Sequence, residues 1–92
     1  MKKLLIWGTG NLAEIFVKNR YNGEIIGFIE TNKVKDTYMD KPVYDSRKIP
    51  NEYDYIVVPK ESNINYELTE YEVDKISETD SCNIYKKFGA DE

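Results

Sequence analysis

An apolar run that breaks into a glycine turn near the start of the chain constrains the fold most. After its first residue, Lys3–Trp7 is continuously apolar, which is typical of a strand buried on both faces of a parallel sheet. Gly8-Thr9-Gly10 follows at once, and the segment after it has apolar side chains at helical spacing. The sequence therefore predicts a central strand, a tight turn and a helix over 11–20.

Further strands are predicted downstream of this helix. Glu24–Ile29 and Tyr53–Val58 are rich in β-branched and aromatic residues, and Pro42–Tyr44 has room for one very short strand. The polar segment 31–41 is predicted to be a loop, and 45–50 replaces a full crossover helix. A strand, a helix and a second strand in succession form a right-handed parallel unit.

The last third of the chain is less regular. Ile64, Leu68 and Tyr71 fall on one helical face, so a helix is predicted there. The acidic stretch Glu67–Asp80 is interpreted as a solvated helix face. Ser81–Phe88 is predicted to be a short edge strand.

These elements predict the fold class α/β. The expected architecture is a small three-layer, Rossmann-like open parallel sheet of about four or five strands in the order 3-2-1-4-5, with a very short third strand. Residues 1–92 are predicted to form a single nucleotide-binding domain. Whether it is the N-terminal part of a larger architecture stays open.

The composition excludes several classes of function. The chain has 92 residues, with 13 Lys+Arg, 17 Asp+Glu and no His, and a net charge of −4. Without His there is no Ser–His–Asp or Cys–His nucleophile, so we predict no catalytic residue and no metal site. The acidic balance opposes binding to nucleic acid or an anionic membrane. A single cysteine, Cys82, and the lack of a long apolar run predict a cytoplasmic protein with small-molecule or protein partners.

The glycine turn is the first candidate binding element. The segment 8–13 fits the pattern G-x-G-x-x-[G/A] between a strand and a helix, where small residues let the backbone approach a diphosphate. The backbone N–H groups of Gly10, Asn11 and Leu12 are expected to face the ligand at the positive end of the helix. Thr9 and Asn11 add side-chain donors. The alternative is that the turn is glycine-rich only so that helix and sheet pack closely.

Three more candidates follow the predicted strands. Glu30 lies 22 residues after Gly8, where a carboxylate accepts hydrogen bonds from a ribose diol and favours NAD-like over NADP-like ligands. Lys60 and Ser62 follow the strand at 53–58 and are candidates to close the far side of the site. The alternatives are that Glu30 is a solvated strand end and Lys60 an ordinary exposed lysine.

Four segments together resemble a known family. In order along the chain they are Lys2–Gly10, Glu24–Glu30, Lys41–Tyr44 and Tyr53–Val58. They resemble the Rossmann-like N-terminal domains of bacterial sugar O-acyltransferases and of related surface-polysaccharide proteins, including nucleotide-sugar dehydratases and some sugar methyltransferases. The resemblance covers residues 2–60.

This resemblance implies a module that binds a dinucleotide or a nucleotide-sugar, with Gly8, Gly10 and Glu30 lining the site. The chain lacks the His and the hexapeptide repeats with which those acyltransferases catalyse transfer. Tyr71 and Lys75 have the Y-x-x-x-K spacing of the dehydratases, but we interpret them as an ordinary pair on a helix.

Two functions remain open. The first is a nucleotide or nucleotide-sugar binding module, with an NAD-like or UDP-sugar-like ligand, of a bacterial polysaccharide-biosynthesis protein. The second is a non-catalytic structural or interaction domain with a vestigial Rossmann site. A homo-oligomer, or a catalytic portion that follows these residues, is compatible with either.

Overall fold

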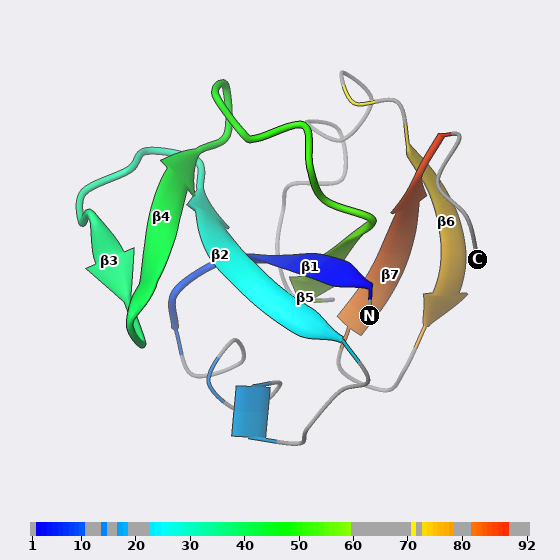
Figure 1. The fold of residues 1–92 in the computed structure, drawn as a ribbon, viewed down its shortest axis with the longest axis horizontal. Coiled ribbons are helices and arrows are strands. Elements are labelled where there is room, and N and C mark those ends of the chain that lie inside the picture. The colour runs from blue at the N-terminus through cyan, green and yellow to red at the C-terminus, as the bar shows by residue number, and fades with distance from the viewer. Residues whose placement is uncertain are drawn as a thin grey trace.

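The described residues form one seven-stranded sheet (Figure 1). The computed structural model describes residues 2–10, 14, 17–18, 23–59, 71, 73–78 and 82–88, and more than half of these lie in strands. The strands are β1 (Lys3–Trp7), β2 (Glu24–Glu30), β3 (Thr37–Tyr38), β4 (Lys41–Asp45), β5 (Tyr55–Pro59), β6 (Val73–Glu78) and β7 (Cys82–Lys87).

The sheet has a parallel centre and antiparallel margins. The strand order is β3-β4-β2-β1-β5-β7-β6. The neighbours β4, β2, β1 and β5 are parallel to one another. At one margin β3 runs antiparallel to β4, and at the other β7 runs antiparallel to β5 and to β6. The sheet is therefore mixed.

The predicted α/β class, with its three-layer Rossmann-like architecture and open parallel sheet, is wrong. The described residues contain no complete helix: Glu14, Val17 and Lys18 have helical backbone, and the rest of the helix predicted over 11–20 lies outside the described residues. The prediction inferred helical layers from the apolar spacing over 11–20 and at Ile64, Leu68 and Tyr71. Of these three residues, Ile64 and Leu68 lie outside the described residues. Here a β-hairpin, β6–β7, extends the sheet sideways instead (Figure 1).

The interpretation of Glu67–Asp80 as a solvated helix face is also wrong where it is described. Residues Val73–Glu78 form β6, of which all but the first residue are exposed. A solvated helix face and an exposed edge strand have the same polar composition, so the sequence does not distinguish them. The pairing of β6 with β7 shows that this segment is a strand. Lys75 lies in this strand, so Tyr71 and Lys75 are not a helical pair. β7 is not an edge strand, because β6 lies outside it.

The segment predicted as a loop over 31–41 contains β3, which forms a hairpin with β4. The two residues of its turn, Met39 and Asp40, have φ angles of 50° and 65°. A two-residue turn with positive φ at both positions suits the twist of a hairpin. The very short strand expected at Pro42–Tyr44 is the middle of the five-residue strand β4.

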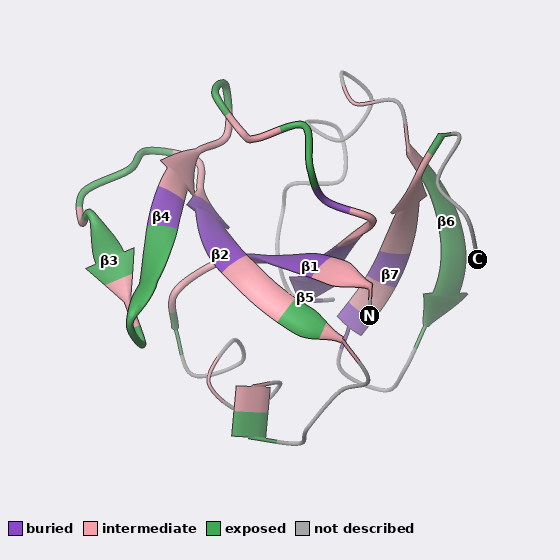
Figure 2. Ribbon diagram, viewed as in Figure 1, coloured by how far each residue is buried: buried purple, intermediate pink, exposed green. Residues whose placement is uncertain are grey.

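Buried residues are concentrated in the central strands (Figure 2), and their side chains form one cluster on each face of the sheet. Successive side chains of a strand point to opposite faces, so Leu5 and Trp7 of β1 join one buried cluster and Ile6 joins the other. Four of the five residues in β1 and in β5 are buried. The two clusters are Leu5, Trp7, Ile29, Tyr53, Ile56 and Val58 on one face, and Ile6, Phe28, Val43, Val57, Cys82 and Ile84 on the other.

Candidate functional site

The glycine turn lies at the edge of the sheet where the parallel strands end. The carboxyl ends of β1, β2, β4 and β5 share this edge because the four strands are parallel. The N–H of Gly8 donates a hydrogen bond of 2.7 Å to the carbonyl of Ile29 in β2. Gly8 has a φ of 102°, which side chains rarely allow, so glycine is required there by the turn itself.

Glu30, the last residue of β2, connects two loops at this edge. Its Oε2 accepts a hydrogen bond of 2.8 Å from the Thr9 hydroxyl, and its Oε1 accepts one of 3.2 Å from the N–H of Val34. A carboxylate offers about four lone-pair positions. Glu30 therefore holds the glycine turn against the loop after β2 and keeps acceptor capacity for a further donor.

Gly10 differs from Gly8 in what its surroundings require. A Cβ atom at Gly10 would meet nothing within 4 Å, and its φ is not in the left-handed region. Neither packing nor backbone conformation therefore calls for glycine at this position. The space beside Gly10 is open to an incoming group.

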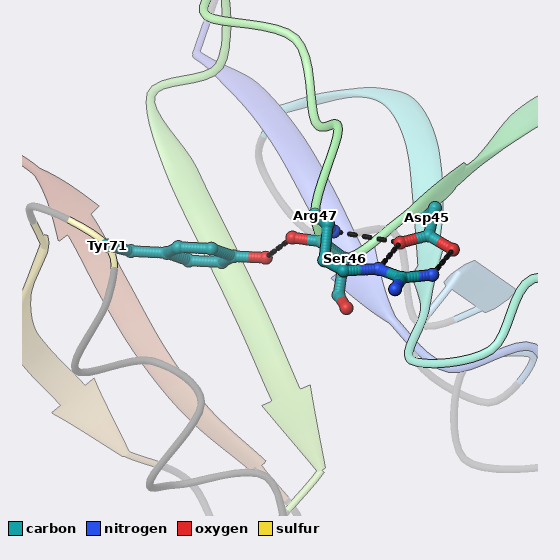
Figure 3. Close-up of polar contacts among 4 residues, drawn as sticks. All are labelled: Asp45, Ser46, Arg47 and Tyr71. Atoms are coloured by element: carbon teal, nitrogen blue, oxygen red, sulfur yellow. Dashed lines mark hydrogen bonds and ion pairs between the residues drawn. The ribbon is translucent and has the colours of Figure 1, made fainter.

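Asp45 stands next to Glu30 at the end of β4, as its register partner. The Arg47 guanidinium donates from Nε to Oδ1 of Asp45 at 3.0 Å and from Nη2 to Oδ2 at 3.2 Å (Figure 3). The backbone N–H of Arg47 donates to the same Oδ1 at 2.9 Å. The side-chain hydrogen bond from Arg47, with the backbone one, lowers the pKa of Asp45 from 3.8 to about 2. Asp45 is ionised at neutral pH.

An open hollow of about 510 Å³ lies beside this pair, and Asp45, Arg47 and Lys48 line it. Ligand sites for small molecules have volumes of about 300–1,000 Å³. The Arg47 side chain is 78% exposed, so most of its guanidinium faces solvent. Of the described residues, those that line the hollow are therefore two cations and one paired carboxylate.

Tyr71 supports the loop that carries Arg47. Its hydroxyl donates a hydrogen bond to the backbone carbonyl of Ser46, toward which the side chain points in Figure 3. Its ring packs on Trp7, with ring centroids 5.8 Å apart and an interplanar angle of 36°. Tyr71 thus contacts both the end of β1 and the loop after β4.

The structure brings some of the residues proposed from the sequence together. Gly8, Thr9, Gly10 and Glu30 lie side by side at the carboxyl edge. The other four candidates lie outside the described residues: Asn11, Leu12, Lys60 and Ser62.

Sequence reasoning missed the hollow at Asp45, Arg47 and Lys48. The available signal is the charged run directly after a short parallel strand, in the segment 45–50 that is interpreted above as replacing a crossover helix. Among the described residues, no group of three or more His, Cys, Asp or Glu side chains is placed to hold a metal ion. The described part of the chain also contains no helix that is both long and apolar enough to cross a membrane.

Comparison with known proteins corrects the family expected from the sequence. Residues 1–78 match the model of a family described as C2185-like, N-terminal. No curated protein and no solved structure is significantly similar to the chain. The resemblance to Rossmann-like domains of sugar O-acyltransferases and polysaccharide-biosynthesis proteins is therefore wrong. The mixed sheet is not the Rossmann nucleotide-binding fold that this resemblance implied.

Proposed function

We propose a binding function for this chain, which belongs to the C2185-like N-terminal family: it binds a small anionic ligand of the nucleotide or nucleotide-sugar class. The proposed site is the carboxyl edge of β1, β2 and β4. The hollow lined by Asp45, Arg47 and Lys48 is the observation that supports the proposal most.

The charges around the hollow favour an anion. Arg47 uses two side-chain N–H groups on Asp45, and a guanidinium has five, so donors remain for a ligand. The Lys48 ammonium makes no ion pair within the described part of the chain. Arg47 supplies a planar pair of donors and Lys48 a point charge, a combination that suits phosphate oxygens.

The neighbouring turn favours a ligand that carries a sugar as well as a phosphate. Glu30 holds Thr9 and the N–H of Val34, and its remaining lone pairs suit the hydroxyl donors of a ribose or hexose. The open space at Gly10 lets a bulky group approach the backbone closely. This argument rests on local geometry and takes no support from a Rossmann fold.

The proposal is tested by thermal unfolding with inorganic phosphate, UDP, UDP-N-acetylglucosamine and NAD, each at millimolar concentration. A ligand at about 100 times its Kd adds about 2.7 kcal/mol to the free energy of unfolding, which raises the Tm by several degrees. We expect a nucleotide to raise the Tm more than phosphate does.

Two variants remove the proposed contacts. Lys48→Gln removes a cation from the hollow, and Gly10→Val places a branched side chain in the space where a Cβ atom would meet nothing within 4 Å. Both are expected to lose the Tm increase caused by the nucleotide. Lys41→Gln is the matched control, because Lys41 is exposed at the opposite end of β4. If no ligand raises the Tm of a cooperatively unfolding protein, the proposal is wrong and an interaction domain is favoured instead.

A further inference from the structure

A second open hollow lies against the buried cluster that contains Trp7, and its described lining shares no residue with the hollow at Arg47. Its volume is about 220 Å³. Tyr53 belongs to that cluster, and Ile49 and Tyr71 pack against it. The hollow is therefore a depression in the surface of the core, with apolar and aromatic walls. The described residues that line it are Ile49, Asn51, Tyr53, Tyr71 and Lys87.

Lys87, the last residue of β7, places a cation at this hollow. Its ammonium donates a hydrogen bond to the backbone carbonyl of Asn51 and lies over the Tyr53 ring, with Nζ 5.2 Å from the ring centroid. An ammonium has three N–H donors, so a bond to one carbonyl leaves two for other acceptors. Lys87 forms no ion pair with any residue that the structure describes, and none of the described lining residues is acidic. The charge of the hollow therefore favours an anion.

The size and lining of the hollow limit the ligand to one ring with a small substituent. An apolar cavity of about 150 Å³ is enough for benzene, whereas sites for drug-sized ligands have about 300–1,000 Å³. A volume of about 220 Å³ lies between these values. Tyrosine rings pack favourably against another aromatic ring in offset or edge-to-face geometry. A carboxylate on such a ring suits the N–H groups of Lys87 that remain.

We infer that this hollow is a second binding site, and that its ligand is a small aromatic carboxylate. The ring packs against Tyr53 and Tyr71, and the carboxylate accepts charge-assisted hydrogen bonds from the Lys87 ammonium. The Asn51 carbonyl and the Tyr53 ring already hold this ammonium in the free protein, so binding costs little side-chain freedom. The inference goes beyond the proposed function and does not depend on it.

The test is a titration of isotope-labelled protein with benzoate, followed by the NMR shifts of the backbone amides. Benzoate is expected to bind saturably and to shift the amides of residues 49–53 and 85–87 most. Benzamide has nearly the same shape without the charge, and acetate has the charge without the ring. Each is expected to bind about tenfold more weakly than benzoate.

Two lysine variants test the role of the cation. Lys87→Gln keeps a donor for the Asn51 carbonyl and removes the charge, so it is expected to weaken benzoate binding about tenfold. Lys86→Gln is the matched control, because it removes the same charge from the preceding residue of β7, whose side chain points to the opposite face of the sheet. It is expected to bind benzoate as tightly as the wild type.

Several results would overturn the inference. They are the absence of saturable benzoate binding, equal affinities for benzoate and benzamide, and unchanged affinity in Lys87→Gln. If Lys48→Gln weakens benzoate binding and Lys87→Gln does not, benzoate occupies the hollow at Arg47 and the inference is also wrong. The comparison of benzoate with benzamide uses the wild type alone, so it tests the charge even where a variant is unstable.

Discussion

The Asp45–Arg47 pair makes the stability of the protein depend on pH. Hydrogen bonds from Arg47 favour the ionised carboxyl, and the pKa of Asp45 is about 2 in the folded protein against an ordinary 3.8. A carboxyl whose pKa is lower when folded contributes stability that is present above pH 3.8 and is lost as the pH falls towards 2.

Asp45→Asn is therefore expected to flatten the acid limb of the stability curve. The variant has no carboxyl to protonate at this position, so its Tm should fall less steeply than that of the wild type between about pH 4 and pH 2. Thermal unfolding followed by circular dichroism across this range measures both slopes. Parallel curves would show that the pair contributes nothing to the acid response.

Glycine is required at position 27 of β2 because residues of the neighbouring strand β4 approach its backbone closely. A Cβ atom there would lie 2.6 Å from Cε2 of Tyr44 and 2.9 Å from the carbonyl oxygen of Pro42. Gly27→Ala is expected to cost about 1–3 kcal/mol, the usual range for overpacking a core.

Gly10→Ala is the matched control for this substitution, because a Cβ atom at Gly10 meets nothing within 4 Å. Its free energy of unfolding should stay within about 0.5 kcal/mol of the wild type. Urea denaturation of the two variants gives both values. Equal stabilities would mean that Tyr44 moves aside at no cost.

At the scale of elements, the β3–β4 hairpin carries a turn whose residues do not suit it. Met39 and Asp40 both have positive φ, and Asn-Gly is the preferred pair for such a turn. Met39 is 41% exposed, so replacing it removes few contacts. The double substitution Met39→Asn with Asp40→Gly is expected to raise the free energy of unfolding by about 1–2 kcal/mol.

Chemical denaturation measures this gain, and either single variant should give part of it. A less stable double variant would mean that the Met39 side chain contributes more through its contacts than its backbone conformation costs. The hairpin lies away from the hollow at Arg47, so ligand binding should stay unchanged.

Elements also differ in how far the sequence predicts them. β1 and β5 are buried on both faces, and their continuous apolar runs were sufficient to identify them. β6 is polar and exposed, so its sequence carries no period that separates a strand from a helix. β3 has only two residues, and its existence depends on the turn at Met39 and Asp40.

The residues of the candidate site also differ in how far the sequence predicts them. Gly8 to Gly10 and Glu30 were proposed from a pattern of spacing, because each follows a recognisable strand. Arg47 and Lys48 were missed because their place depends on the register of β2 with β4, which puts Glu30 beside Asp45.

At the scale of the whole molecule, the order of strands in space departs from their order along the chain. β7 is the last of the described strands in sequence, yet it lies between β5 and β6. β6 joins the sheet through β7, and the apolar strand β5 has β7 as its second neighbour.

This arrangement has a consequence for synthesis on the ribosome. β5 is largely apolar, and β7 is its partner on one side. Until residues 82–87 have left the exit tunnel, the backbone N–H and C=O groups on that side of β5 lack this partner. A nascent chain in this state offers a template to which a strand of another chain can pair. The release of β7 therefore removes this pairing site from the growing protein.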